Sequence, residues 1–153
     1  MSKKSENIIL CIAAHPDDEV LGLGGTLIKH VNRGDLVYII ILSDGEGAKI
    51  HKKEKNLDRK NNAINCSKIM GTTIHKIFNY PDQQFDTVPR LDIIQCLERE
   101  LKKIKPSIVY THHLSDINID HRIASEALLT ALRPMNKLGI KPTSSAPKTL
   151  ECE

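Results

Sequence analysis

Short apolar runs alternate along the chain with longer segments in which apolar residues recur at helical spacing. The runs are of strand length and fall on residues 7–14, 36–42, 73–79 and 107–111. Three of them are nearly continuous in apolar side chains, which is typical of strands covered on both faces, and the first is expected to be central. Helical periodicity predicts helices over residues 20–32, 57–70, 91–104 and 120–132.

The order of these elements predicts the fold class. A strand followed by a helix occurs four times, and such alternation requires right-handed crossovers between parallel strands. We therefore expect an α/β fold, with a parallel sheet and helices on both faces. Residues 1–133 hold all of these elements and are expected to form one domain. Residues 134–153 are rich in Lys, Pro, Ser and Thr and have no periodic segment, so we predict a poorly structured C-terminal tail.

Composition and charge argue against several classes of protein. Hydrophobic residues make up 40% of the chain, which allows an ordinary core. The net charge is +3 and the basic residues are spread along the sequence, so we expect no nucleic acid partner. No apolar stretch approaches the ~18 residues of a membrane span. The cysteines, Cys11, Cys66, Cys96 and Cys152, are far apart, which favours reduced thiols and a cytoplasmic protein.

Polar residues follow three of the predicted strands at the points where those strands end. Residues 15–19 (HPDDE) follow the first strand, residues 43–46 (SDGE) the second, and residues 112–121 (HHLSDINIDH) the fourth. Ligands of open parallel sheets bind in the crevice beyond the carboxyl ends of the strands. We therefore expect these three groups to lie together at one edge of the sheet.

Two of these groups contain residues that bind metals. His15 and Asp18, three residues apart in a predicted turn, can converge on one ion. Zinc takes imidazole nitrogen and carboxylate oxygen as ligands, and a catalytic zinc usually has three protein ligands and a water. We select His121 as the third, because it lies beside Asp120 and ligating histidines commonly donate their second N–H to a carboxylate. Asp17 then points elsewhere, within reach of a proton of the metal-bound water. Such a set also suits Fe²⁺.

Two short motifs resemble a known family of enzymes. Residues 14–19 (AHPDDE), followed by residues 118–121 (NIDH), look like the signature of the PIG-L family, the zinc-dependent N-acetylglucosaminylphosphatidylinositol deacetylases and their LmbE-like bacterial relatives. The resemblance extends over residues 7–133. It implies a Rossmann-like fold, zinc as the cofactor, and hydrolysis of an N-acetyl group on an amino-sugar conjugate with release of acetate.

The resemblance also implies roles for individual residues. By their positions in the motifs, His15, Asp18 and His121 become metal ligands and Asp17 becomes the general base. Arg59 falls where relatives have an arginine that faces the substrate.

The sequence departs from the family pattern at one position of the second motif. Many relatives have a histidine where this chain has Asn118, and that histidine stabilises the oxyanion or protonates the leaving amine. We assign Asn118 to substrate binding and Asp120 to a supporting position behind the metal ligands. His113, a few residues upstream, is the candidate for the missing catalytic function.

Two other classes of α/β module share parts of this pattern. Residues 22–25 (GLGG) resemble a phosphate loop, but Leu27 replaces the third glycine of that motif and the carboxylates of residues 17–19 would repel a pyrophosphate. A phosphoacceptor receiver domain would need an acceptor after the third strand, where Asp82 is the candidate, and a lysine after a fifth strand, which the pattern does not predict.

A third alternative is a metal-binding homologue without activity. Relatives generally continue for several dozen residues beyond the fourth helix, so we expect a shortened C-terminal part. Such a chain could keep the metal site and lose activity or specificity, and an exposed sheet edge would favour a homo-oligomer. In the active case the expected partner is a small-molecule amino-sugar conjugate.

Overall fold

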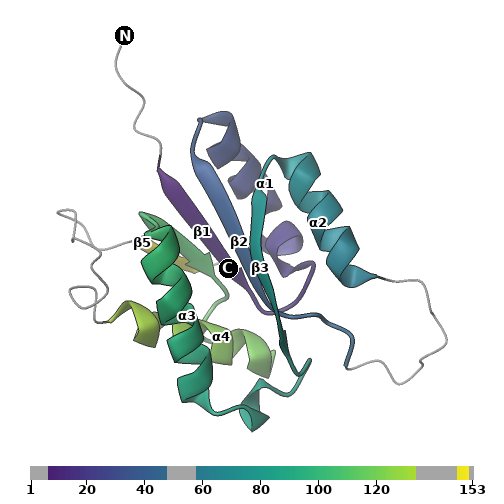
Figure 1. The fold of residues 1–153 in the computed structure, drawn as a ribbon, viewed down its shortest axis with the longest axis vertical. Coiled ribbons are helices and arrows are strands. Elements are labelled where there is room, and N and C mark those ends of the chain that lie inside the picture. Colours follow the sequence, from purple (N-terminus) through teal and green to yellow (C-terminus); the bar gives the residue numbers. More distant parts are fainter. Residues whose placement is uncertain (1–6, 48–57, 134–147, 152–153) are drawn as a thin grey trace.

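The computed structural model describes residues 7–47, 58–133 and 148–151, which form a five-stranded parallel sheet with helices on both faces (Figure 1). The strands are β1 (Ile8–Ala13), β2 (Leu36–Ser43), β3 (Thr73–Tyr80), β4 (Ile108–Thr111) and β5 (Lys148–Glu151). Their order across the sheet is β3-β2-β1-β4-β5. β1 is therefore central, paired with β2 on one side and β4 on the other, as its continuous apolar run predicts.

The helices divide between the two faces of the sheet. They are α1 (Asp18–Asn32), α2 (Arg59–Met70), α3 (Arg90–Ile104) and α4 (Ile119–Leu132), with a short 3-10 helix, η1 (Phe85–Thr87), before α3. Buried residues of α1 and α2 pack in one apolar cluster and those of α3 and α4 in another (Figure 1). The expected Rossmann-like α/β architecture is confirmed.

Successive side chains of β1 explain why both faces are covered. Leu10 and Ile12 belong to the cluster with α3 and α4, whereas Ile9 and Cys11 belong to the cluster with α1 and α2. All four are at most 1% exposed. A strand buried on both faces must be apolar at every position, because neighbouring side chains point to opposite sides of the sheet.

The C-terminal segment corrects one expectation. The sequence predicts no regular element after residue 133, but residues 148–151 form β5, which pairs in parallel with β4. This segment (KTLE) has no apolar run, so its strand conformation follows from backbone pairing with β4. A hydrophobic pattern cannot predict such pairing. The rest of the predicted tail, residues 134–147 and 152–153, lies outside the described residues, as does Leu57 at the start of the predicted second helix.

The positions of the glycines in residues 22–25 argue against the nucleotide-binding alternative. Gly22, Gly24 and Gly25 lie inside α1, more than one turn into the helix. A phosphate loop instead connects a strand to a helix N-terminus, where backbone N–H groups are available to the ligand. None of the helices within residues 7–47 and 58–133 is both long and apolar enough to cross a membrane.

Candidate metal centre

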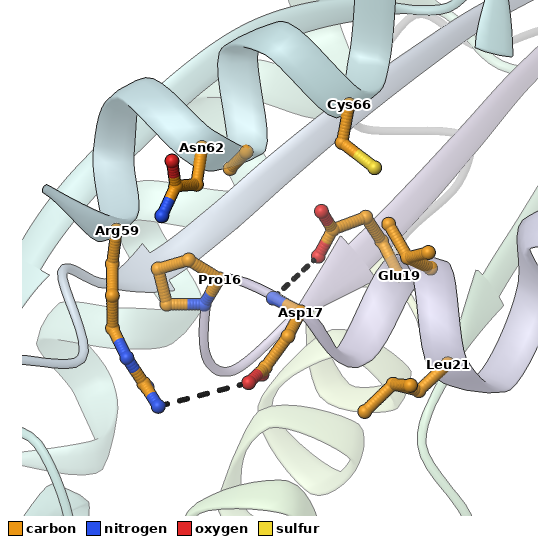
Figure 2. Close-up of a pocket in the computed structure, with 9 residues that line it drawn as sticks. Pro16, Asp17, Glu19, Leu21, Arg59, Asn62 and Cys66 are labelled. Carbon is orange, nitrogen blue, oxygen red and sulfur yellow. Dashed lines mark hydrogen bonds and ion pairs between the residues drawn. The ribbon is translucent and has the colours of Figure 1, made fainter. Parts of the chain in front are cut away.

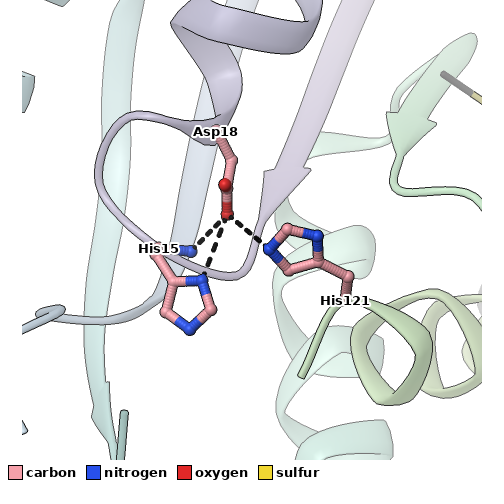
Figure 3. A group of neighbouring side chains, drawn as sticks. All are labelled: His15, Asp18 and His121. Atoms are coloured by element: carbon pink, nitrogen blue, oxygen red, sulfur yellow. Dashed lines mark hydrogen bonds and ion pairs between the residues drawn. The ribbon is translucent and has the colours of Figure 1, made fainter. Parts of the chain in front are cut away.

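Three of the predicted ligands meet at the carboxyl edge of the sheet. His15 follows β1, Asp18 is the first residue of α1, and His121 lies in the first turn of α4. Asp18 Oδ2 is 3.4 Å from His15 Nδ1 and 3.4 Å from His121 Nε2 (Figure 3). The same oxygen accepts the backbone N–H of His15 at 2.8 Å, which fixes the turn between strand and helix. The side chains are 6%, 15% and 16% exposed, so the group is largely shielded from solvent.

In each of the two histidines, the ring nitrogen that does not face Asp18 lies next to another carboxylate. His15 Nε2 lies 3.0 Å from Asp120 Oδ2, and His121 Nδ1 lies 2.9 Å from Asp116 Oδ2. A neutral imidazole in either pair donates its proton to the carboxylate and presents a lone pair on the nitrogen beside Asp18. This is the arrangement in which metal-ligating histidines are commonly oriented.

The partner of His121 differs from the one that the sequence suggests. Asp120 supports His15, and the carboxylate behind His121 is Asp116, in the loop before α4. Neighbouring residues on an α-helix point about 100° apart, so Asp120 cannot reach the ring of His121 in the way that adjacency in sequence implies. The supporting position predicted for Asp120 is therefore found, behind a different histidine.

Asp120 also fastens the loop that follows β3. Its carboxylate is fully buried and accepts the backbone N–H groups of Gln83 at 2.7 Å and Phe85 at 3.0 Å. These contacts bring Asp82 Oδ1 to 3.3 Å from His15 Nε2, with Asp82 only 6% exposed. Sequence reasoning considered Asp82 only as a phosphoacceptor and missed its place beside His15.

His112 is the second residue that sequence reasoning missed. Its ring stacks on that of His121, with centroids 3.9 Å apart, and its Nε2 accepts the backbone N–H of Ala14 at 2.8 Å. Nε2 is also 3.6 Å from Asp18 Oδ2. Burial, with a contribution from the charge of His121, lowers the pKa of His112 to about 4 although Asp18 opposes the shift, so this ring is neutral near pH 7. The expected catalytic residue was its neighbour His113, whose Nδ1 accepts the N–H of Ser115 at 3.0 Å.

Asp17 has an unusual backbone conformation between the metal-binding residues. Its φ is 142° and its ψ is −27°, in a region that favours glycine. Such a residue costs on the order of 1–3 kcal/mol and persists only where its surroundings hold it. Its backbone N–H donates to Glu19 Oε2 at 3.1 Å, and its carboxylate lies 3.7 Å from Arg59 Nη2 (Figure 2). Burial and the charge of Asp18 raise the pKa of Asp17, and Arg59 only partly opposes them.

A pocket of about 270 Å³ opens beside Asp17, between the start of α1 and one face of α2 (Figure 2). Its lining residues are Pro16, Asp17, Glu19, Val20, Leu21, Arg59, Asn62, Ala63 and Cys66. Gly45, with φ of 70°, lets the loop after β2 pack against this wall, since a Cβ there would lie 2.8 Å from Arg59 Nη1. Arg59 thus lines the pocket, and its role toward a substrate stays a prediction. The side chain of Asn118 accepts the N–H of Asp120 and caps α4.

The donor set fits a divalent transition metal. Two imidazole nitrogens and one carboxylate oxygen are the donors that zinc prefers, and donors about 2.0–2.2 Å from a tetrahedral ion lie roughly 3.4 Å apart. Asp18 keeps that separation from both histidines, which is longer than an ordinary N–H···O bond. Burial disfavours the charge on Asp18, but the adjacent rings of His121 and His15 outweigh burial and lower the pKa of Asp18. Its carboxylate is therefore ionised, as a ligand must be.

Comparisons with known proteins identify relatives of this chain. A deacetylase of Escherichia coli strain K12, YaiS, described as uncharacterized, is 31% identical over 137 residues, which are 85% of this chain and 70% of that protein. The 4-oxalmesaconate hydratase of Pseudomonas putida is 28% identical over 155 residues, 90% of this chain and 58% of the hydratase.

The fold also matches a solved structure, the N,N'-diacetylchitobiose deacetylase of Pyrococcus horikoshii, with a TM-score of 0.76 at 23% identity over 97% of this chain. This chain covers 61% of that structure, so it spans less than two thirds of both the hydratase and the chitobiose deacetylase. The family model of PIG-L, GlcNAc-PI de-N-acetylase, matches residues 10–132. This match covers most of the chain and includes both motifs, and the chain therefore belongs to the PIG-L family.

Proposed function

We propose that the protein is a zinc-dependent hydrolase that removes the N-acetyl group of an amino-sugar conjugate and releases acetate. The observation that carries the proposal is the position of Asp18 Oδ2, 3.4 Å from one nitrogen of His15 and of His121, while the other nitrogen of each ring faces a carboxylate. Membership of the PIG-L family and similarity to proteins named as deacetylases support the reaction class.

His15, Asp18 and His121 would hold the metal ion. A bound zinc ion would supply Lewis-acid activation of the amide carbonyl and of a water molecule. With a metal bound, the carboxylates of Asp120 and Asp116 would keep the two rings in the tautomer that offers a lone pair to the metal. The same donors suit Fe²⁺, so the metal has to be identified by analysis.

Asp17 is proposed as the general base for the attacking water. Its neighbour Asp18 belongs to the ligand set, and its carboxylate faces the 270 Å³ pocket. The raised pKa moves Asp17 toward the range in which a carboxylate exchanges protons efficiently near neutral pH. Arg59, 3.7 Å away, favours the ionised form that accepts the proton.

The proton that returns to the leaving amine is proposed to come from Asp17 as well. His112 is neutral near pH 7, and its Nε2 already accepts the N–H of Ala14, so this ring holds no proton to give at that nitrogen. His113 is the alternative suggested by the sequence. Because its Nδ1 accepts the N–H of Ser115, His113 would have to deliver the proton from Nε2. Activity retained in His113→Ala would favour Asp17, and activity lost would favour His113.

The pocket suits a sugar ring. A volume of about 270 Å³ lies just below the usual range of ligand pockets, so it matches one sugar ring better than an extended conjugate. Arg59 and Asn62 offer donors for hydroxyl groups, and Val20, Leu21 and Ala63 offer apolar contact. The rest of the conjugate would extend beyond this pocket. Asn118 caps α4, and its role in substrate binding stays a prediction.

A hydratase is the second candidate. The relative from Pseudomonas putida, 28% identical over 90% of this chain, is named 4-oxalmesaconate hydratase. Addition of water to a carbon–carbon double bond would use the same base, and Arg59 could bind a substrate carboxylate. Deacetylation is preferred because the family model and YaiS both point to it.

The test combines metal analysis with two activity assays. Zinc and iron are measured in the purified protein and in His121→Ala, and both proteins are assayed for acetate release from N-acetylglucosamine derivatives and for hydration of unsaturated dicarboxylates. We expect one zinc ion per chain, its loss in the variant, and acetate release that requires the metal. Zinc with hydration alone would favour the hydratase, zinc with neither activity would favour an inactive homologue, and no metal would overturn the proposal.

A further inference from the structure

Two buried oxygen atoms near the candidate metal centre lack a hydrogen-bond partner within the described part of the chain. They are Oε1 of Glu19, in the first turn of α1, and Oγ1 of Thr111, at the end of β4. Glu19 is 1% exposed and Thr111 is 2% exposed. Buried polar atoms are almost always hydrogen-bonded, to protein or to ordered water, so a pair of unpartnered atoms requires an explanation.

Both residues line the same small cavity. Its volume is about 40 Å³, and its wall also includes Asp18 and His112, while apolar residues of β1 and α1 complete it. A cavity needs about 10–15 Å³ on this measure to hold a water molecule, together with two to four polar partners. The cavity therefore has room for a water molecule, and both residues that carry an unpartnered oxygen belong to its wall.

A metal cation does not fit this cavity. Calcium takes six to eight oxygen ligands and magnesium demands an octahedral set. The two unpartnered oxygens of Glu19 and Thr111 stand among mainly apolar side chains such as Ile12, Ala13 and Leu23. Water, which can donate to the carboxyl group and bond to the hydroxyl group at once, is the ligand that this wall suits.

The other oxygen of Glu19 holds the strained residue of the site. Glu19 Oε2 accepts the backbone N–H of Asp17 at 3.1 Å, as Figure 2 shows. Asp17 has a φ of 142°, which a residue with a side chain rarely adopts without a restraint. The orientation of the Glu19 carboxyl group therefore bears directly on the backbone conformation of Asp17.

We propose that the cavity binds one water molecule between Glu19 and Thr111, and that this anchored carboxyl group makes Glu19 a positioning residue for Asp17. The water fixes one oxygen of the carboxyl group, so the other remains on the N–H of Asp17. Thr111 comes from β4 and Glu19 from α1, so the water links the helix that follows Asp17 to the sheet. Only the consequence for catalysis rests on the proposed function, whereas the water site and the backbone of Asp17 can be tested without it.

The first experiment is a high-resolution crystal structure of the metal-loaded protein and of Thr111→Val and Thr111→Ser. We expect one ordered water within hydrogen-bond distance of Glu19 Oε1 and Thr111 Oγ1 in the wild type and in Thr111→Ser. Valine has nearly the shape of threonine but no hydroxyl group, so the water should be lost in Thr111→Val. A wild-type cavity without ordered water, or a water unaffected by Thr111→Val, would overturn the site.

The second experiment asks whether Glu19 positions Asp17. Glu19→Leu should change the backbone of Asp17 and lower kcat by about 10- to 100-fold, as small misplacements of catalytic groups do, while KM and zinc content stay near wild type. Glu19→Gln keeps an acceptor for the N–H of Asp17 and a polar group at the cavity, so it should restore most of kcat. Equal losses in both variants, or loss of zinc together with kcat, would overturn the positioning role. If the wild type releases no acetate, the proposed function fails, but the water and the φ of Asp17 still decide this inference.

Discussion

Two buried networks of histidine and carboxylate lie at opposite ends of the sheet, and they differ in how the ring nitrogens are used. At the turn between α1 and β2, His30 Nδ1 lies 2.7 Å from Asp35 Oδ2 and His30 Nε2 lies 2.9 Å from the hydroxyl of Tyr110. The second oxygen of Asp35 accepts both the backbone and the side-chain N–H of Asn7 at 3.1 Å. Every ring nitrogen and carboxylate oxygen of this pair has a protein partner at normal hydrogen-bond distance.

The carboxyl end of the sheet is built differently from the same residue types. His15 and His121 each use one nitrogen for a carboxylate at 2.9–3.0 Å, and both turn the other nitrogen toward a single oxygen of Asp18 at 3.4 Å. These longer separations suit donors arranged around an ion. A histidine beside an aspartate is therefore not evidence of a metal site in itself. The use of the second nitrogen distinguishes a structural pair from a candidate ligand.

The largest expected effect comes from exchanging one histidine of each network for alanine. His15→Ala should lose zinc and fall to background activity, because it removes a ligand. His30→Ala should keep one zinc per chain and instead lose about 2–4 kcal/mol of stability, because it removes a buried side chain together with its hydrogen bonds to Tyr110 and Asp35. Elemental analysis and urea unfolding measure the two effects. Loss of zinc from a folded His30→Ala would remove the distinction between the networks.

The next effect concerns Asp17, whose carboxylate belongs to neither of the two networks. Asp17→Asn should bind zinc and substrate normally and lower kcat by about 10²- to 10⁴-fold, because an amide cannot accept the proton of water. Asp86→Asn, an exposed aspartate of η1, is the matched control and should leave kcat unchanged. Steady-state kinetics with zinc analysis provides the measurement. Near-wild-type kcat in Asp17→Asn would mean that another group is the base.

A third prediction follows from the protonation of His15. Burial opposes its charged form, but Asp120 and Asp18 outweigh burial and raise the pKa of His15 from 6.5 to about 9 without metal. Zinc must displace that proton, so zinc affinity should rise by about tenfold per pH unit up to about pH 9. Stability of the metal-free protein should run the opposite way. A group whose pKa is raised in the folded state contributes its full stabilisation below pH 6.5. That stabilisation is lost as pH rises through about 9.

Calorimetry in buffers of different ionisation enthalpy measures the released proton, and thermal unfolding of the chelated protein measures the stability. Titrations in competing chelators give the affinity at each pH. A zinc affinity that does not change between pH 6.5 and 9 would mean that His15 is neutral in the free protein.

Most of the fold could be predicted from the sequence because a strand that is buried on both faces is apolar at every position. The continuous run of residues 7–14 predicted a central strand, and alternation of such runs with helical periodicity predicted the parallel sheet. β5 has no such pattern, because it is only 4 residues long and its sequence, KTLE, contains no apolar run. Strands that form by pairing at a sheet edge are specified by their neighbour, which a local pattern does not contain.

The candidate site was predictable in its position and only partly in its contacts. The motifs placed His15, Asp18 and His121 at one edge because the ends of parallel strands meet there. The carboxylate behind each histidine was not predictable, since it depends on the rotation of α4 that turns Asp120 toward His15. The position of His112 against His121 likewise depends on the path of the loop after β4.

The smallest expected effect tests the structural network alone. Burial disfavours the charge on Asp35, but hydrogen bonds from His30 and Asn7 outweigh it and lower its pKa below 3.8. A lowered pKa contributes stability above the unfolded value, and that contribution is lost as pH falls through the folded value. Asp35→Asn should therefore cost about 1.5–3 kcal/mol at pH 7, and the difference from wild type should narrow toward pH 3. Urea unfolding across this pH range, with Asp86→Asn as control, measures it. Zinc content should not change, because Asp35 lies in the network whose nitrogens are already partnered; a loss of zinc in folded Asp35→Asn would show that the two ends of the sheet are coupled.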